Sequence, residues 1–151
     1  FVHSQSWQSA YRGIVEDEII DSFTPEKRAE IFENILPVCS EEYYLFRVDG
    51  HPAGIASLNK SHEEHAPDYR GEIYAIYFHP DFWGTAVTHK GLRFCVERLK
   101  ELGYTQVTIW VLKDNRRARN FYEKNGFCFD GSKKEIAVGK PLTEIRYSKN
   151  V

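Results

Sequence analysis

Two apolar segments with a helical segment between them constrain the fold of this chain more than any other feature. The segments EIYAIYF at 72–78 and TQVTIWVL at 105–112 carry apolar side chains on both alternating faces, which is typical of strands buried on both sides. Between them, residues 86–102 have apolar side chains at helical intervals, and Gly103 follows. A strand, a helix and a second strand in this order predict a right-handed parallel crossover.

The segments on either side predict antiparallel neighbours for these two strands. Residues 43–58 form two β-rich runs around Asp49-Gly50, a strong hairpin turn signal, and two closing strands are expected at 127–136 and 142–149, joined through VGKPL. Helices are expected at 3–12, after the Thr24-Pro25 cap, and at 115–125. We therefore expect one domain over 1–151 of the α/β class, with a mixed central sheet flanked by helices.

Composition excludes several functional classes. The formal net charge of −2 gives no general attraction to nucleic acid or to an anionic membrane, and no apolar run is long enough to cross a bilayer. Three widely spaced cysteines without a CxxC pair predict free thiols in a reducing cytoplasm, with no disulfide framework and no zinc site. The sequence has no methionine even at its start, so we expect either a longer natural product or a modified methionine left out of the sequence.

The junction between the first buried strand and the next helix is a candidate anion site. Unpaired N–H groups at the start of a helix, together with its dipole, favour an anion. Gly84 permits close approach of the backbone, and the hydroxyl groups of Thr85 and Thr88 could add donors. An ordinary helix cap explains the same residues equally well.

The segment NRRARNFYEKNGF at 115–127 is a second candidate. Asn115 and Tyr122 fall on or near one helical face, and a tyrosine facing a cleft can donate a proton to a leaving group. The alternative is a core tyrosine with one hydrogen-bond partner. The arginines between them suit a solvated helix face or, alternatively, contacts with phosphate groups.

Glu72 opens an otherwise apolar strand, where burial would raise the pKa of its carboxyl group and suit it to act as a general base. A strand-end glutamate in water is the alternative. The cluster of His62, Glu63, Glu64 and His65 resembles a set of metal ligands, but it lies in a loop with Pro67, and we expect no metal site.

Together these segments resemble the GNAT superfamily of acetyl-CoA-dependent N-acetyltransferases. The resemblance covers nearly the whole chain and is most specific in EIYAIYFHPDFWG, LKELGYTQVTIWVL and NRRARNFYEKNGF. It implies a GNAT-like fold whose usual N-terminal strand is missing from this sequence. It also implies transfer of an acetyl group from acetyl-CoA directly to an amine of a small molecule or a peptide, without an acyl-enzyme.

The resemblance also implies a role for each matching residue. Tyr122 would protonate the departing thiolate, and Glu72 would be the general base. Ile76 and Phe78 would offer backbone hydrogen bonds to the pantetheine arm and the acetyl carbonyl, and Asn115 would contact the same arm. The pyrophosphate would lie on Trp83, Gly84, Thr85, Ala86, Val87, Thr88 and His89.

This last loop departs from the family pattern. The family has Arg or Gln, two variable residues, Gly, one variable residue, and then Gly or Ala. Here Trp83, Ala86 and Thr88 stand at the three defined positions. If either of the latter two needs a positive φ, its Cβ atom adds strain. The departure favours an alternative function, a non-catalytic acyl-CoA-binding regulatory or interaction module.

The acceptor is not specified by the sequence. Acidic residues in the first helices and the 60–70 loop suit a cationic amine, and equally suit a solvated surface. The closing strands could pair across a homodimer by analogy with similar folds.

Overall fold

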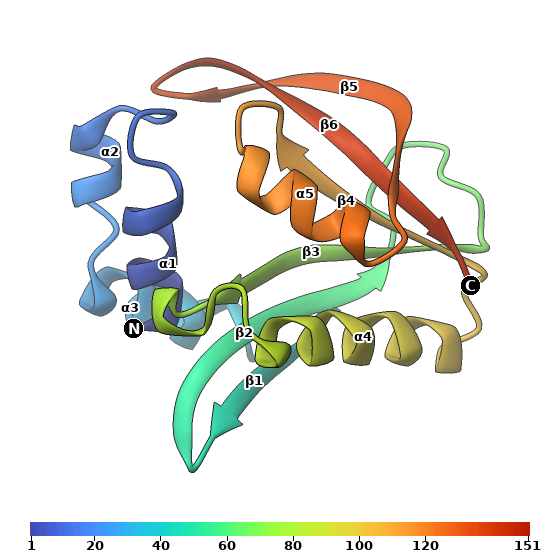
Figure 1. Ribbon diagram of the computed structural model, residues 1–151, viewed down its shortest axis with the longest axis horizontal. Coiled ribbons are helices and arrows are strands. Elements are labelled where there is room, and N and C mark those ends of the chain that lie inside the picture. The colour runs from blue at the N-terminus through green and yellow to red at the C-terminus, as the bar shows by residue number, and fades with distance from the viewer.

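A six-stranded mixed sheet forms the centre of the structure, a computed structural model that describes residues 1–151. The strands are β1 Glu42–Val48, β2 His51–Lys60, β3 Arg70–Phe78, β4 Gln106–Leu112, β5 Cys128–Val138 and β6 Lys140–Asn150. They lie in the order β1-β2-β3-β4-β6-β5, and only β3 and β4 are parallel. The predicted mixed sheet, with a parallel pair between two antiparallel hairpins, is confirmed (Figure 1).

Helices cover both faces of the sheet. They are α1 Val2–Ala10, α2 Asp17–Asp21, α3 Pro25–Ile35, α4 Ala86–Glu101 and α5 Arg116–Lys124, with a short 3-10 helix η1 at Pro80–Phe82. Tyr77 of β3 contacts Trp7 of α1, whereas the next residue, Phe78, lies against Gly91 of α4. Because successive side chains of a strand point to opposite faces, α1 and α4 cover opposite faces. None of the helices is long and apolar enough to cross a membrane.

Local signals set most of the element ends. Thr24 accepts a hydrogen bond from the backbone N–H of Lys27 at 3.3 Å, with Pro25 at the first helical position, as predicted. Sequence reasoning missed the five-residue α2, whose Ile20 is buried with Val15, Leu112 and Leu142. The closing hairpin is also longer than predicted, because β5 and β6 continue to a tight turn at Gly139 in place of a loop over VGKPL.

The main core lies between the sheet and the pair formed by α4 and α5. It is an apolar cluster that includes Leu58, Ile73, Leu92, Leu99 and Tyr147. Cys95 is buried in it, and all three cysteines are free, as predicted. This core fixes α4 and α5 against the strands on which the candidate site residues lie.

The two parallel strands pair over only their first few residues. Arg70, Gly71 and Glu72 of β3 lie opposite residues 106–108 of β4, and no pairing follows. β4 instead stays paired with β6 along its whole length. On the other side, a bulge in the β2–β3 pair leaves Tyr74 without an opposite residue. The carboxyl-terminal halves of β3 and β4 therefore diverge (Figure 1), and the space between them is the candidate site.

Candidate functional site

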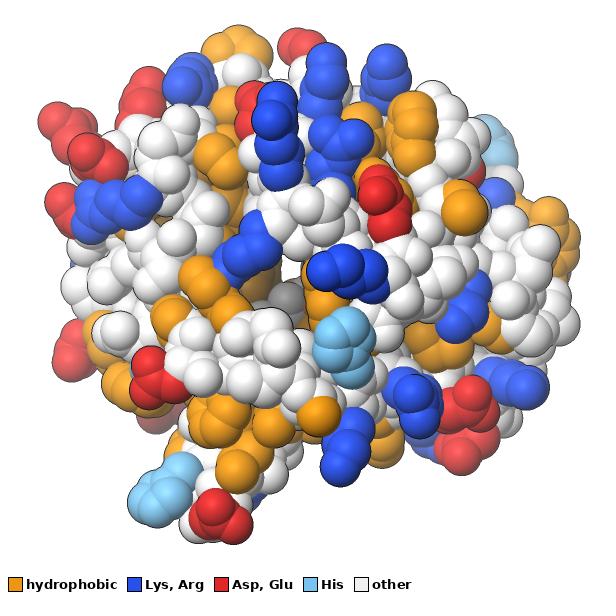
Figure 2. Space-filling model, viewed as in Figure 1, with side chains coloured by type: hydrophobic (Ala, Val, Ile, Leu, Met, Phe, Trp, Pro, Cys, Tyr) orange, Lys and Arg blue, Asp and Glu red, His pale blue; other side chains and the backbone are white.

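A cavity of about 460 Å³ opens where β3 and β4 diverge. Figure 2 shows a hollow near the centre of this face, with apolar walls and basic side chains at its rim. Nine of the twelve predicted site residues line the cavity: Glu72, Ile76, Phe78, Trp83, Gly84, Thr88, His89, Asn115 and Tyr122. Thr85, Ala86 and Val87 belong to the same turn but do not line it.

The turn from β3 to α4 presents unpaired backbone N–H groups. The N–H groups of Gly84, Ala86 and Thr88 donate to no protein atom, while that of Val87 is capped by the Thr85 hydroxyl oxygen at 3.3 Å. Such a set of donors at the start of a helix suits an anion.

The two departures from the family pattern in this turn cause no backbone strain. Of the residues from 83 to 89, only Gly84 has a positive φ, +74°, whereas Ala86 and Thr88 lie in α4. The prediction that threonine hydroxyls act as extra donors is wrong. Thr85 donates to the carbonyl of Phe82 at 2.7 Å, and Thr88 donates to the carbonyl of Thr85 at 2.9 Å. These hydroxyl groups shape the turn, and its free donors are backbone N–H groups.

A basic side chain reaches over this turn from α5. The guanidinium carbon of Arg117 lies 3.0 Å from the centroid of the Trp83 ring, and the Trp83 indole donates to the carbonyl of Phe78 at 2.9 Å. No carboxylate pairs with Arg117, which lines the cavity. Sequence reasoning left Arg117 open between a solvated helix face and a phosphate contact. The sequence signal for a phosphate contact was its position two residues after Asn115, in the first turn of the same helix.

The edge of β3 that faces the cavity has free backbone groups. The N–H of His79 donates to the carbonyl of Ala53 in β2 at 2.8 Å. Because hydrogen bonding alternates along an antiparallel pair, the backbone groups of Ile76 and Phe78 point away from β2. The Phe78 carbonyl already accepts a hydrogen bond from the Trp83 indole. The N–H groups of both residues and the Ile76 carbonyl remain available at the cavity.

Asn115 and Tyr122 enter the cavity from α5. Asn115 is buried and caps α5, since its side-chain oxygen accepts the N–H of Ala118 at 3.2 Å, and its amide nitrogen has no protein acceptor. Tyr122 is 6% exposed, and its hydroxyl group has no hydrogen-bond partner in the protein. Burial raises the pKa of Tyr122 well above its ordinary value, and the neighbouring Tyr77 adds to this rise. The phenol therefore keeps its proton at neutral pH.

Glu72 lies where the paired part of β3 ends, and it is 8% exposed. Its Oε2 atom accepts the Ser61 hydroxyl at 2.9 Å and the His62 N–H at 3.3 Å. Burial raises the pKa of Glu72, while these two hydrogen bonds act in the opposite direction. The predicted desolvated carboxylate on this strand is therefore observed.

Part of the cavity wall is aromatic, which sequence reasoning did not anticipate. The residues of this wall are Tyr11 at the C-cap of α1, Tyr74 and Tyr77 of β3, and Trp110 of β4, together with the Lys134–Glu144 pair at 3.4 Å. The residues of the candidate metal cluster at 62–65 contact other side chains. His62 lies 3.3 Å from a carboxylate oxygen of Glu41, and Glu63 forms an ion pair with Arg146 at 2.6 Å.

Comparison with known proteins gives a family match and several relatives. Residues 7–127 match the acetyltransferase (GNAT) family. Mycothiol acetyltransferase of Propionibacterium freudenreichii is 32% identical over 72 residues, which cover 48% of this chain and 23% of that protein. An uncharacterized N-acetyltransferase of Methanocaldococcus jannaschii is 26% identical over 98 residues, 64% of this chain and 42% of that protein. The matched regions thus span less than half of these curated relatives.

A solved structure shares the fold over nearly the whole chain. The PaiA N-acetyltransferase of Thermoplasma acidophilum, in complex with coenzyme A, superposes with a TM-score of 0.74. The superposition covers 99% of this chain and 89% of that one, at 19% identity.

Proposed function

The chain belongs to the acetyltransferase (GNAT) family, and we propose that it moves an acetyl group from acetyl-CoA directly to an amine of a small molecule or a peptide. One observation carries the proposal. A single cavity joins the unpaired N–H groups at Gly84 and Thr88 to the protonated Tyr122 and the desolvated Glu72. These are the anion site, the acid and the base that such a transfer needs.

The residues present fit acetyl-CoA as the co-substrate. The backbone N–H groups of Gly84, Ala86 and Thr88 would hold its pyrophosphate, and the unpaired Arg117 would add a positive charge at the same place. The free β3 edge at Ile76 and Phe78, with the Asn115 amide, would hold the pantetheine arm. The coenzyme A complex of the Thermoplasma protein is consistent with this assignment.

Glu72 would prepare the acceptor. An alkyl amine is protonated at neutral pH, and only the neutral form attacks a carbonyl carbon. A carboxylate with a raised pKa takes the proton from the ammonium group more readily than an ordinary one. The aromatic part of the cavity wall, with Tyr11, Tyr77 and Trp110, would hold the rest of the acceptor.

Tyr122 would complete the transfer. As the C–N bond forms and the C–S bond breaks, the coenzyme A sulfur leaves as a thiolate, and the nitrogen loses one more proton, which restores the Tyr122 hydroxyl after Tyr122 has protonated the sulfur. The Tyr122 hydroxyl is free to donate its proton to that sulfur, because it has no partner in the protein. No step requires a cysteine, and the three thiols are free, which suits a cytoplasmic location.

The experiment that tests this proposal has two stages. Thermal unfolding is followed with acetyl-CoA and then with CoA, and a ligand at a hundred times its dissociation constant adds about 2.7 kcal/mol of stability. Release of CoA is then followed with a panel of primary amines: phenethylamine, spermidine, free lysine and a short peptide. We expect a clear stability shift and turnover of at least one amine.

Two other outcomes separate the alternatives. A shift without turnover of any amine would support the non-catalytic acyl-CoA-binding module. The absence of a shift at millimolar acetyl-CoA would refute cofactor binding and, with it, the proposed transfer.

A further inference from the structure

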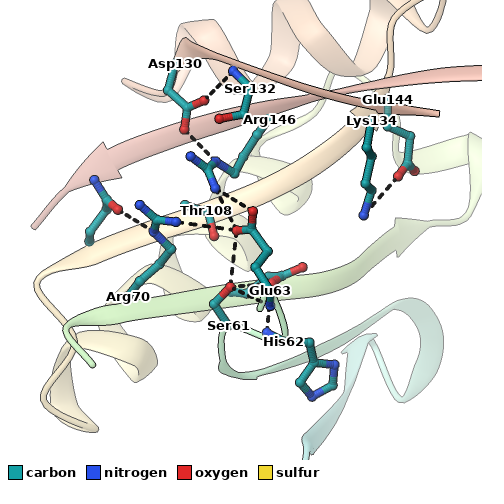
Figure 3. A network of polar contacts seen from close by, with 12 residues as sticks. Ser61, His62, Glu63, Arg70, Thr108, Asp130, Ser132, Lys134, Glu144 and Arg146 are labelled. Atoms are coloured by element: carbon teal, nitrogen blue, oxygen red, sulfur yellow. Dashed lines mark hydrogen bonds and ion pairs between the residues drawn. The ribbon is translucent and has the colours of Figure 1, made fainter. Parts of the chain in front are cut away.

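One serine hydroxyl lies between two carboxylates beside the cavity. The Ser61 Oγ atom is 2.9 Å from Oε2 of Glu72 and 3.3 Å from Oε2 of Glu63. Figure 3 shows the Ser61 side chain beneath Glu63, in the loop that follows β2. A serine hydroxyl has one hydrogen, so it can donate to only one of the two carboxylates at a time. The backbone N–H of Ser61 donates to the carbonyl of Arg70 at 3.1 Å, which fixes the hydroxyl between them.

Glu63 is held in place by two guanidinium groups. Both of its oxygens accept from Nη1 of Arg146, at 2.6 and 2.7 Å, and Nε of Arg146 donates to Asp130 at 2.7 Å (Figure 3). Arg70 adds a second guanidinium at 3.6 Å. Charge-assisted contacts of this kind fix the position of a carboxylate.

Glu63 and Glu72 both line a second cavity, and Glu63 is the more exposed of the two. This cavity of about 570 Å³ is lined by both glutamates, by Trp110 and by residues of the 62–64 loop and β5. The side chain of Glu63 is 25% exposed, whereas Glu72 as a residue is only 8% exposed. A proton that reaches Glu63 can therefore leave to solvent more easily than one that stays on Glu72.

The charges around Glu72 come from three directions. Glu63 from the loop favours its protonated form, and Lys134 from β5 favours its ionised form. Burial, and then the charge of Glu72, raise the pKa of Tyr74 on the same strand. Arg146 of β6 affects Glu72 only indirectly, through its ion pair with Glu63. The hydrogen bonds from Ser61 and from the His62 backbone N–H support the ionised carboxylate.

We propose that Ser61 and Glu63 are positioning residues that form a proton relay for Glu72. The inference rests on the proposed role of Glu72 as the base. Glu72 takes a proton from the acceptor ammonium group. That proton passes to the Ser61 oxygen as the Ser61 hydroxyl proton passes to Glu63, and Glu63 releases it to water in the second cavity. Glu72 is then again ionised, and no other reactant is consumed.

Carboxyl ¹³C NMR titration tests the relay without any acceptor. The signals of Glu72 and Glu63 are followed against pH in the whole chain, and Glu72→Gln and Glu63→Gln assign them. In the wild-type protein, the Glu63 signal should show an inflection where Glu72 titrates, because the Ser61 hydrogen changes partner. Ser61→Ala should abolish that inflection, and Ser61→Thr should keep it.

The direction of the Glu72 titration gives a second readout. Loss of the hydroxyl in Ser61→Ala should move the Glu72 titration to higher pH by roughly one pH unit. Loss of the neighbouring charge in Glu63→Gln should move it to lower pH. Static electrostatics alone gives these opposite shifts, so they show that both residues act on Glu72, and the relay itself is decided by the Glu63 inflection and by kcat. Unchanged Glu72 and Glu63 titrations in Ser61→Ala would overturn the proposal.

Kinetics with the panel amine of highest turnover complete the test. Ser61→Ala and Glu63→Gln should lower kcat about tenfold or more, with the KM for acetyl-CoA unchanged. Added imidazole buffer should restore the kcat of the Glu63→Gln variant, because imidazole can accept the proton in the second cavity. Ser22→Ala is the matched control, since the Ser22 hydroxyl donates to the carbonyl of Ile19 at 2.7 Å and contacts neither glutamate. Wild-type kcat in both relay variants would refute the relay. Absence of turnover in the wild-type protein would refute the proposed function, and the titrations would still decide the relay.

Discussion

Replacement of Gly91 by alanine should destabilise the protein, although alanine is the better helix former. Gly91 lies in α4 against the ring of Phe78, where an added Cβ would be 2.4 Å from Cζ and 3.0 Å from Cε1. The ring is held on its other side as well. A Cβ at Gly54 would be 2.4 Å from Cδ1 of Phe78, and the ring stacks on Phe46 at a centroid distance of 5.5 Å. Phe78 therefore cannot turn aside, and α4 has to move away from the sheet.

Two opposing effects set the size of the change. The better helix propensity of alanine contributes about 1 kcal/mol in favour of Gly91→Ala. Overpacking of a well-packed core costs about 1 to 3 kcal/mol, and a contact at 2.4 Å from a held ring lies toward the upper end of that range. We expect a net loss of roughly 1 to 2 kcal/mol, or a decrease in Tm of roughly 2 to 8 °C for a domain of this size.

The same displacement should weaken cofactor binding. The N–H groups of Ala86 and Thr88 belong to α4, and the carbonyl of Phe78 holds the Trp83 indole at 2.9 Å. The assays are urea unfolding followed by circular dichroism and calorimetric titration with acetyl-CoA. Phe78→Leu shortens the opposing side chain, so the double variant should recover part of the loss. A Gly91→Ala protein as stable as the wild type, with unchanged affinity for acetyl-CoA, would refute this account of the packing.

Three further predictions concern the site. Tyr122→Phe should lower kcat by about 10² to 10⁴-fold, the range for a general acid, and should leave Tm unchanged because the hydroxyl has no partner; equal losses of Tm and kcat would indicate a structural role. Arg117→Met should weaken acetyl-CoA binding but not binding of acetyl-pantetheine, which lacks the phosphates, and calorimetry with both ligands would contradict a phosphate contact if the two affinities fell together. Because burial raises the pKa of Glu72, activity should fall as the pH decreases through that pKa, and the folded state should bind this proton more tightly than the unfolded chain. Glu72→Gln should therefore raise stability at neutral pH and abolish turnover, and a less stable variant would contradict the assigned burial cost.

Most of the fold was predictable because its signals are local. Strands buried on both faces differ in their hydrophobic period from the helix between them, and Thr24-Pro25 marks a helix start in the sequence and in the structure. The short α2 was not predictable in this way. Its five residues are helical because Ile20 packs on Leu112 and Leu142, which lie far away in the sequence.

The candidate site was only partly predictable for the same reason. Gly84, Asn115 and Tyr122 were assigned from motifs, and each lines the cavity. The sequence did not indicate that the Thr85 and Thr88 hydroxyls turn back to backbone carbonyls, since this depends on the geometry of the turn. It also left open whether Arg117 faces solvent or the anion site, because a helical side chain can extend to either.

Most of the strands and helices, and the residue types available for chemistry, follow from the sequence alone, because propensity, periodicity and capping act over a few neighbouring residues. The separation of β3 and β4 after Glu72, which opens the cavity between them, is seen only in the folded chain. The same is true of the position of Ser61 between Glu72 and Glu63, and of Arg117 over Trp83. These arrangements depend on strand register and on packing between distant segments, and neither is encoded in any short stretch of the chain.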